Sequence, residues 1–469
     1  MSAPRSRRML FVLVVMLTTG VLSAWATQPS VGTPEPSPGL AGHAQRYRQA
    51  FDRAFADAPA AVRAAAEVRA RQIYTETLAG AVQQRDLAPQ GATPCVDGHA
   101  GQWPCRNVDL LSFLPMSALG GGNANDLWGW TDPQTDKEYV VFGRTNGTAF
   151  VDISDPTNPI YLGNLPSHVG TSVWRAMKVY QNVAYIVADA LPHGMQVFDL
   201  TRLRNVPNPP VTFTEDFFYS GMDNTHTLAV NEETGYLYAV GTNTCRGGLH
   251  MIDVHTNPLK PTFAGCYGDD GYVHETQCVV YHGPDVTYQG HEVCFAHDED
   301  TVTIIDVTDK TNPVQISRTP YQGSGYTHQG WLTESQKVLV VNDELDEEFF
   351  GGNTRTRFFD VRDLDSIPPP RLYQHATNAI DHNLYVRGAL IYETNYRAGL
   401  RVLAGGPVHE IGFFDVWPSD DEASFNGTWN NYPFFQSRVI ALSGIEQGLF
   451  LVKLHRSPPQ GSSDFIDLG

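Results

Sequence analysis

The sequence predicts an all-β fold, a seven-bladed β-propeller that is closed by an N-terminal strand and preceded by a short α-helical segment. The first observation is a repeat, because seven similar stretches follow one another 49, 51, 48, 54, 54 and 48 residues apart. They begin at Asp126, Arg175, His226, His274, His328, His382 and Asn430. A period of about 50 residues is expected of propeller blades and of few other architectures. The second observation is an apolar strand containing one aspartate, which recurs in five units at Asp152, Asp199, Asp253, Asp306 and Asp360.

The first residues have the pattern of an export signal. Arg5, Arg7 and Arg8 precede an apolar run from Met9 to Leu22, and Ala24-Trp-Ala offers a small-x-small cleavage site. The apolar run is too short for a comfortable membrane span. We therefore expect residues 1–26 to be a signal peptide, and the mature chain to be secreted or periplasmic without a transmembrane helix.

Two further segments precede the repeats. Residues 27–43 are rich in Pro, Gly, Ser and Thr and predict a flexible leader. Residues 44–85 carry apolar side chains at broadly helical intervals and predict a helical spacer, which Pro59 divides into two helices. Nothing in this spacer suggests chemistry.

Residues 95–455 contain short β-rich runs separated by turn residues and predict the propeller itself. Each unit is expected to have four strands, and the recurrent aspartates are interpreted as hydrogen-bonded structural groups. The seventh unit has three strands, so its outer strand is expected to come from the stretch that begins at Val108. Such a closure leaves no free sheet edge. Residues 456–469 are expected to be a disordered tail.

Six cysteines in an exported chain predict disulfide bonds. Local spacing favours three pairs within short loops or hairpins, namely Cys95–Cys105, Cys245–Cys266 and Cys278–Cys294. Cysteine metal ligation is a weak alternative, because the sequence has no Cys-x-x-Cys spacing.

The formal net charge of −19 limits the classes of partner. Removal of the signal peptide takes away three of the 32 basic residues, which leaves 29 against 51 acidic residues, a net charge of −22. Such acidity argues against binding to nucleic acid or to anionic lipid. We expect a monomer whose ligand is a protein or a small molecule.

Several long motifs resemble a known family. They are Gly248-Leu-His-Met-Ile-Asp-Val, Tyr272-Val-His-Glu-Thr-Gln-Cys, Tyr326-Thr-His-Gln-Gly-Trp-Leu-Thr and Val341-Asn-Asp-Glu-Leu-Asp-Glu. In this order they resemble the choice-of-anchor B family, which comprises exported bacterial proteins built from LVIVD-type propeller repeats. The resemblance implies a propeller outside the cytoplasm and no established reaction. The tail departs from the family pattern, since it is no anchor, and this favours free secretion or a periplasmic location.

Antiparallel pairing predicts which residues lie beside the start of each innermost strand. In the sixth unit we interpret Arg387-Gly388 as a two-residue turn, which places His382 opposite Glu393. Within a residue or two of register, the same construction places His328 near Asp343, Arg175 near Asp189 and Asp126 near Arg144, and it places His274 near His297. One end of the central channel is therefore expected to carry the seven residues that begin the repeats, backed by carboxylates.

Three interpretations of this ring remain open. The first is a water-filled channel mouth whose polar groups form hydrogen bonds with one another. The second is a transition-metal site in which three of the four histidines bind one ion and Asp343 or Glu393 orients a ring. The third is a pocket for a small anionic or polar ligand, with Arg175 as its charge partner. If hydrolysis occurs, Glu393, Asp343 or Glu275 is the candidate general base. The acidic run from Asn342 to Glu348 is a separate candidate for calcium, with a solvated loop as the alternative.

Two functions follow from the sequence. The first is a non-catalytic recognition or scaffold protein of the bacterial cell envelope or exterior, which binds partners on a face of the propeller. The alternative is a metal-dependent enzyme, a hydrolase or an oxidase, working at His226, His274, His328 and His382. No nucleophile elbow, phosphate-binding glycine loop or His-Glu-x-x-His helix points to another chemistry.

Overall fold

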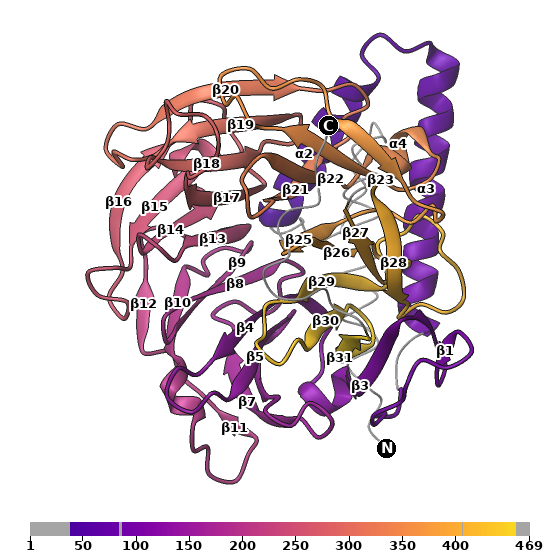
Figure 1. The fold of residues 1–469 in the computed structure, drawn as a ribbon, viewed down its shortest axis with the longest axis vertical. Coiled ribbons are helices and arrows are strands. Elements are labelled where there is room, and N and C mark those ends of the chain that lie inside the picture. The colour runs from indigo at the N-terminus through magenta and orange to yellow at the C-terminus, as the bar shows by residue number, and fades with distance from the viewer. Residues whose placement is uncertain (1–37, 84–86, 406, 456–469) are drawn as a thin grey trace, which may run out of the picture.

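The computed structural model describes residues 38–83, 87–405 and 407–455. Seven antiparallel sheets are arranged in a ring around a central axis, so the predicted seven-bladed propeller is confirmed (Figure 1). The predicted signal peptide, most of the predicted leader and the predicted tail lie outside the described residues.

Each blade has four main strands, numbered along the chain. The innermost strands are β4 (Ala124–Thr131), β8 (Arg175–Tyr180), β13 (Thr227–Asn231), β17 (Glu275–Val280), β21 (Thr327–Leu332), β25 (Asn383–Arg387) and β29 (Thr428–Tyr432). The second strands are β5 (Glu138–Arg144), β9 (Val183–Ala188), β14 (Tyr236–Val240), β18 (Glu292–His297), β22 (Val338–Asp343), β26 (Leu390–Thr394) and β30 (Ile440–Gly444). The third strands are β6 (Gly147–Asp152), β10 (Met195–Asp199), β15 (Leu249–Asp253), β19 (Thr301–Asp306), β23 (Arg355–Asp360), β27 (Leu400–Ala404) and β31 (Gly448–Leu454).

The outer strands vary more in length than the innermost ones. They are β7 (Ile160–Pro166), β12 (Phe217–Tyr219), β16 (Thr262–Tyr267), β20 (Val314–Pro320), β24 (Arg371–Gln374), β28 (His409–Phe414) and β3 (Val108–Pro115). The first blade gains β11 (Val211–Thr212), parallel to β7, and the sixth gains β2 (Trp103–Arg106) and β1 (His99–Ala100). Three short 3-10 helices lie in loops, η1 (Met116–Leu119), η2 (Leu200–Leu203) and η3 (Cys245–Gly247).

The ring is closed by the strand that the sequence analysis predicted. β3 pairs antiparallel with β31, from Val108 opposite Leu454 to Pro115 opposite Gly448. The rings of Phe113 and Phe450 stack across this pair with centroids 4.4 Å apart. The seventh blade is therefore made from both ends of the propeller sequence, and its outer edge is paired.

The recurrent aspartates at the strand ends have the structural role that the sequence predicted. Each carboxylate accepts a hydrogen bond from a backbone N–H two or three residues further on, as Asp152 does from Ser154 at 2.9 Å and Asp306 from Thr308 at 2.9 Å. These bonds satisfy the first donor of the turn into the fourth strand.

The three predicted disulfide bonds are present. Cys95–Cys105 closes the loop that carries β1 and β2, Cys245–Cys266 connects η3 to β16, and Cys278–Cys294 joins two paired strands. Such bonds fit a compartment outside the reducing cytoplasm.

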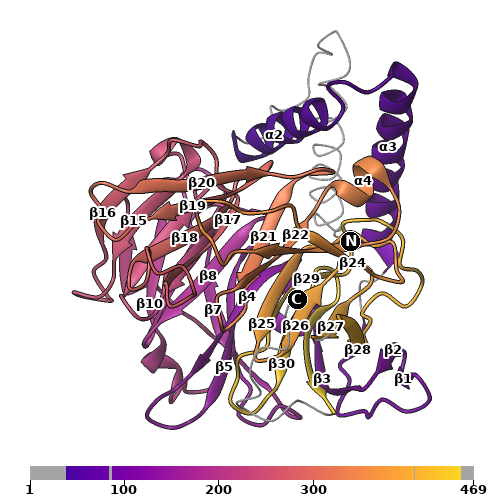
Figure 2. The ribbon, with the colours of Figure 1, turned by 45° about the horizontal axis from the view of Figure 1, so that its top comes forward.

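Two helices lie on one face of the ring, α2 (Pro38–Ala54) and α3 (Ala60–Gln83), and a one-turn helix, α4 (Asp346–Phe350), follows β22 (Figure 2). The helix α2 begins within the stretch predicted as a leader, and Pro59 lies immediately before α3. Phe51 of α2 and Phe55, the residue after the end of α2, are buried against Phe349 of α4. Among the helices that the structure describes, none combines the length and the apolar character needed to cross a membrane.

Candidate functional site

The four histidines that begin the third to sixth repeats lie side by side in one row. Successive ring centroids are 4.2 Å apart for His226 and His274, 4.3 Å for His274 and His328, and 4.4 Å for His328 and His382. Each precedes or opens the innermost strand of its blade, which is why neighbouring blades present them at the same height. We call these four residues the histidine row. None of them is more than 8% exposed.

Hydrogen bonds to the backbone fix the tautomer of three members of this row, His274, His328 and His382. The Nδ1 atom of His274 lies 3.2 Å from the carbonyl oxygen of His328, and Nδ1 of His328 lies 3.1 Å from that of His382. His382 repeats the pattern, with Nδ1 2.6 Å from the carbonyl of Trp429. A carbonyl only accepts, so each Nδ1 carries the proton and donates it. Each Nε2 therefore keeps its lone pair, the form in which imidazole binds a metal ion.

Burial keeps these imidazoles neutral. Desolvation holds the pKa values of His274 and His328 well below the usual range and lowers that of His382 to about 3. The neighbouring imidazoles contribute in the same direction for His274 and His328. The lone pairs are thus available without prior loss of a proton over the whole neutral range.

An acid bridges two members of the row. Glu344 has Oε2 3.7 Å from Nε2 of His328 and Oε1 3.7 Å from Nε2 of His382. Tyr396 donates to Glu344 Oε1 at 2.6 Å, and burial raises the pKa of Glu344 to about 7. One ligand atom from each of these three residues lies within 4.8 Å of the others, so they could hold one metal ion.

The strand registers lie within two residues of the prediction, and His274 lies beside His297 as expected, but Asp343 and Glu393 are not the acids that contact the row. Glu393 pairs with Leu384, because the turn lies at Gly388-Ala389, and its carboxylate lies 3.0 Å from His375 instead of near His382. A bulge at His328 likewise changes the register of β21, so that Asp343 pairs with Thr327.

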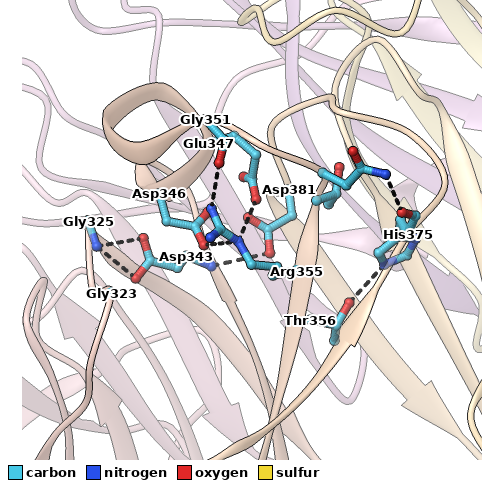
Figure 3. A network of polar contacts seen from close by, with 12 residues as sticks. Gly323, Gly325, Asp343, Asp346, Glu347, Gly351, Arg355, Thr356, His375 and Asp381 are labelled. Atoms are coloured by element: carbon cyan, nitrogen blue, oxygen red, sulfur yellow. Dashed lines mark hydrogen bonds and ion pairs between the residues drawn. The ribbon is translucent and has the colours of Figure 1, made fainter. Parts of the chain in front are cut away.

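The side chain of Asp343 belongs to a hydrogen-bond network separate from the histidine row. Its carboxylate accepts a hydrogen bond from the backbone N–H of Gly325 at 3.0 Å (Figure 3). It also accepts hydrogen bonds from the backbone N–H of Tyr326 at 2.6 Å and from the hydroxyl of Tyr321 at 2.7 Å. The sequence reasoning therefore missed Glu344, the next residue along the chain. Its only signal was membership of the acidic run that was assigned to calcium.

The other predicted members of the ring separate into two groups. Asp126 and Asn430 contact each other, and Lys178 Nζ lies 3.5 Å from the Asp126 carboxylate. Arg175 turns away and donates to the carbonyl of Arg144 at 3.0 Å. Arg175 pairs with Ala188, and Arg144 pairs with Ala124, so the predicted registers hold within one or two residues. Among the described residues, however, no side-chain hydrogen bond or ion pair joins Arg175 to Asp189 or Asp126 to Arg144.

Helix α2 contributes to the site, which the sequence gave no reason to expect. His43 Nε2 lies 2.6 Å from Asp189 Oδ2, and Nδ1 of His226 lies 3.3 Å from the same oxygen. His43 also stacks on Trp174 at 3.7 Å. These three residues, His43, Asp189 and His226, form a second group with ligand atoms within 4.8 Å.

The same helix covers the row. Arg46 lies 4.0 Å above the ring of Tyr272 and 3.5 Å from Glu299. Phe51 packs in one cluster with Tyr326, whose ring centroid is 5.0 Å from that of His274. The helix α2, which includes the first part of the predicted spacer, therefore lies over the histidine row; we call α2 the lid.

The comparisons with known proteins concern the fold. Residues 138–165, which span β5 to most of β7, match the LVIVD repeat. No curated protein matches the sequence. Among solved structures, the chain is similar to the crystal structure of the Myceliophteria thermophila Cps50 (Swd1) β-propeller domain, with 13% identity, a TM-score of 0.44, and coverage of 71% of this chain and 96% of that one. The chain is a β-propeller that contains an LVIVD repeat.

Proposed function

We propose that this is an exported, non-catalytic binding protein that recognises its partner on the face carrying the histidine row and α2, and holds a transition-metal ion there. His328, His382 and Glu344 are the ligands, and His274 is the neighbouring imidazole. The observation that carries the proposal is the hydrogen-bond pattern of His328 and His382. Each Nδ1–H donates to a backbone carbonyl, which leaves two adjacent Nε2 lone pairs beside one carboxylate.

The donor set indicates the kind of ion. Two imidazoles and one carboxylate suit zinc, copper, iron or nickel, and they do not form the all-oxygen set that calcium prefers. The carboxylate also offsets charge, because a bound divalent ion would otherwise be buried among neutral rings.

The covering helix favours binding over catalysis. A catalytic metal keeps one coordination position open to substrate. Here the row is at most 8% exposed, beneath α2. A partner that competes for the docking surface of α2 would gain access to the row, so the proposed recognition surface includes the helix itself.

The test is metal analysis of the untagged mature protein after exposure to zinc or cobalt and removal of excess ion. We expect one ion per chain in the wild type, and a visible cobalt spectrum that shifts or disappears in His328→Ala and His382→Ala. His291→Ala is the matched control, because His291 is a partly exposed histidine outside the row that lies 2.6 Å from an acid, Asp306. Circular dichroism confirms that each variant is folded.

Two results would contradict the proposal. One is a wild-type protein that binds no ion, and the other is equal metal content in His328→Ala and the wild type. Metal-dependent turnover of a test ester or phosphodiester, lost in the same variants, would instead support the alternative of a metal-dependent hydrolase.

A further inference from the structure

A second group of charged residues is buried beside the fifth blade, separate from the histidine row. Asp343 ends β22, Asp346 and Glu347 open α4, and Asp381 lies two residues before β25. All four are at most 1% exposed. Figure 3 shows the carboxyl groups of Asp346, Glu347 and Asp381 close to Arg355, whereas that of Asp343 faces Gly325.

The charges of this group do not balance. Within the part of the chain that the structure describes, its ion pairs involve two cations, Arg355 and Arg357. Arg355 Nε lies 3.0 Å from Asp346 and 3.6 Å from Glu347. Arg357 contacts Asp346 and lies 4.0 Å from Asp343. If all four carboxyl groups are ionised, two guanidinium groups leave two negative charges, and isolated buried charge is strongly unfavourable. Burial accordingly raises the pKa values of Glu347 and Asp381 well above their usual range, so these groups hold protons unless a cation replaces them.

Three carboxylate oxygens of this group also lack a hydrogen-bond donor within the described ranges. Asp346 Oδ1, Glu347 Oε2 and Asp381 Oδ1 are buried and have no hydrogen-bond donor among the described residues. Asp343 differs, because both of its oxygens accept hydrogen bonds from the chain. Buried carboxylate oxygens normally have donors, so three unpartnered ones at one place point to a missing positive partner.

The spacing of these acids fits one ion. Asp346, Glu347 and Asp381 each offer an oxygen, and the three oxygens lie within 4.8 Å of one another. Calcium binds oxygen at about 2.3–2.6 Å, so two oxygens on the same ion are separated by at most about 5 Å. We propose that Asp346, Glu347 and Asp381 bind one calcium ion, whose two positive charges balance the group.

The choice of calcium follows from the donors. The three ligands are all carboxylates, which suit a hard cation, and none is an imidazole or thiolate. Magnesium demands near-octahedral geometry with retained water, whereas calcium accepts irregular sets of carboxylates. The calcium site and the transition-metal site therefore differ in chemistry as well as in residues.

Calcium at this position would stabilise the packing of α2 and α3 against the propeller. Glu348 accepts the hydroxyl of Tyr47 in α2 at 2.5 Å, and the carbonyl of Phe349 accepts Arg69 of α3 at 2.6 Å. Both acceptors belong to α4, which also supplies Asp346 and Glu347. An ion that fixes the position of α4 would therefore stabilise the contacts of α4 with α2 and α3.

The test is calorimetric titration of calcium into the full mature chain after treatment with a chelator. We expect one calcium per chain, with affinity at least tenfold weaker in Asp381→Asn and in Glu347→Gln. The matched control is Asp363→Asn, since Asp285, Asp363 and Asp365 form another group of three acids, which is largely exposed. Hydrogen exchange should show slower exchange in α2 when calcium is added.

The proposal is overturned if the wild type binds no calcium at millimolar concentration, if both site variants bind as the wild type does, or if magnesium binds equally well. If the variants do not fold, crystals of the wild type grown with calcium decide the matter. An anomalous peak between the three carboxylates supports the proposal, and its absence there refutes it. His328→Ala should bind calcium normally, so the two metal proposals fail independently.

Discussion

Replacing Phe51 by alanine should release the lid without unfolding the propeller. Phe51 is fully buried, and its ring centroid lies 4.7 Å from that of Phe55 and 5.3 Å from that of Phe349. Removing a buried phenylalanine side chain costs about 3–5 kcal/mol. Because the lost contacts join α2 to α4, we expect most of this cost to fall on docking. A loss of about 4 kcal/mol raises the undocked fraction roughly a thousandfold.

Hydrogen exchange followed by mass spectrometry measures this directly. Peptides from α2 should exchange much faster in Phe51→Ala, while peptides from β13 and β17 keep their protection. Cobalt should also reach the histidine row faster. Val68→Ala is the control, because Val68 is 65% exposed on α3 and its truncation should change neither rate. The reasoning is refuted if Phe51→Ala lowers the melting temperature of the strands while exchange in α2 stays at the wild-type rate.

Three further predictions concern stability. Replacing both Cys245 and Cys266 by serine opens a loop with a sequence separation of 21, and we expect a loss of about 3 kcal/mol in urea unfolding, whereas an unchanged midpoint would contradict the assignment. Phe113→Ala should cost about 3–4 kcal/mol at the closure and lower the single calorimetric transition of the whole ring; a separate early transition would show that the seventh blade unfolds alone. Burial lowers the pKa of His250 to about 4, so the folded state keeps it neutral, and its contribution of about 3 kcal/mol is present above pH 6.5 and lost as the pH falls toward 4. His250→Gln should flatten that part of the pH dependence of the unfolding free energy, and an identical slope would refute the assignment.

The fold could be predicted from the sequence because its signals are local and repeated. The spacing of the blade starts is set by the length of a four-stranded sheet, and this length varies little around the ring. The closure followed from counting strands, since a seventh unit with three strands needs a fourth such as β3. Each disulfide joins cysteines of one loop or blade, so short spacing was enough to pair them.

The site could be predicted only in part. The four histidines share a position in the repeat, and the ring geometry brings that position together. Their partners depend on details that a repeat does not specify. A bulge at His328 and a turn one residue later than expected moved Asp343 and Glu393 away and left Glu344 as the bridging acid. His43 is far from the row in sequence, so only tertiary packing places it there.

The pairing of β3 with β31 also governs when the molecule can become complete during synthesis. The strand β3 can form this pairing only after β31 has been synthesised, because Val108 pairs with Leu454 at the far end of the propeller sequence. A growing chain can fold its middle blades, but its ring stays open until the last strand has left the ribosome. The entropy of joining such distant segments grows only logarithmically with their separation, so the late closure adds little to the thermodynamic cost of the fold.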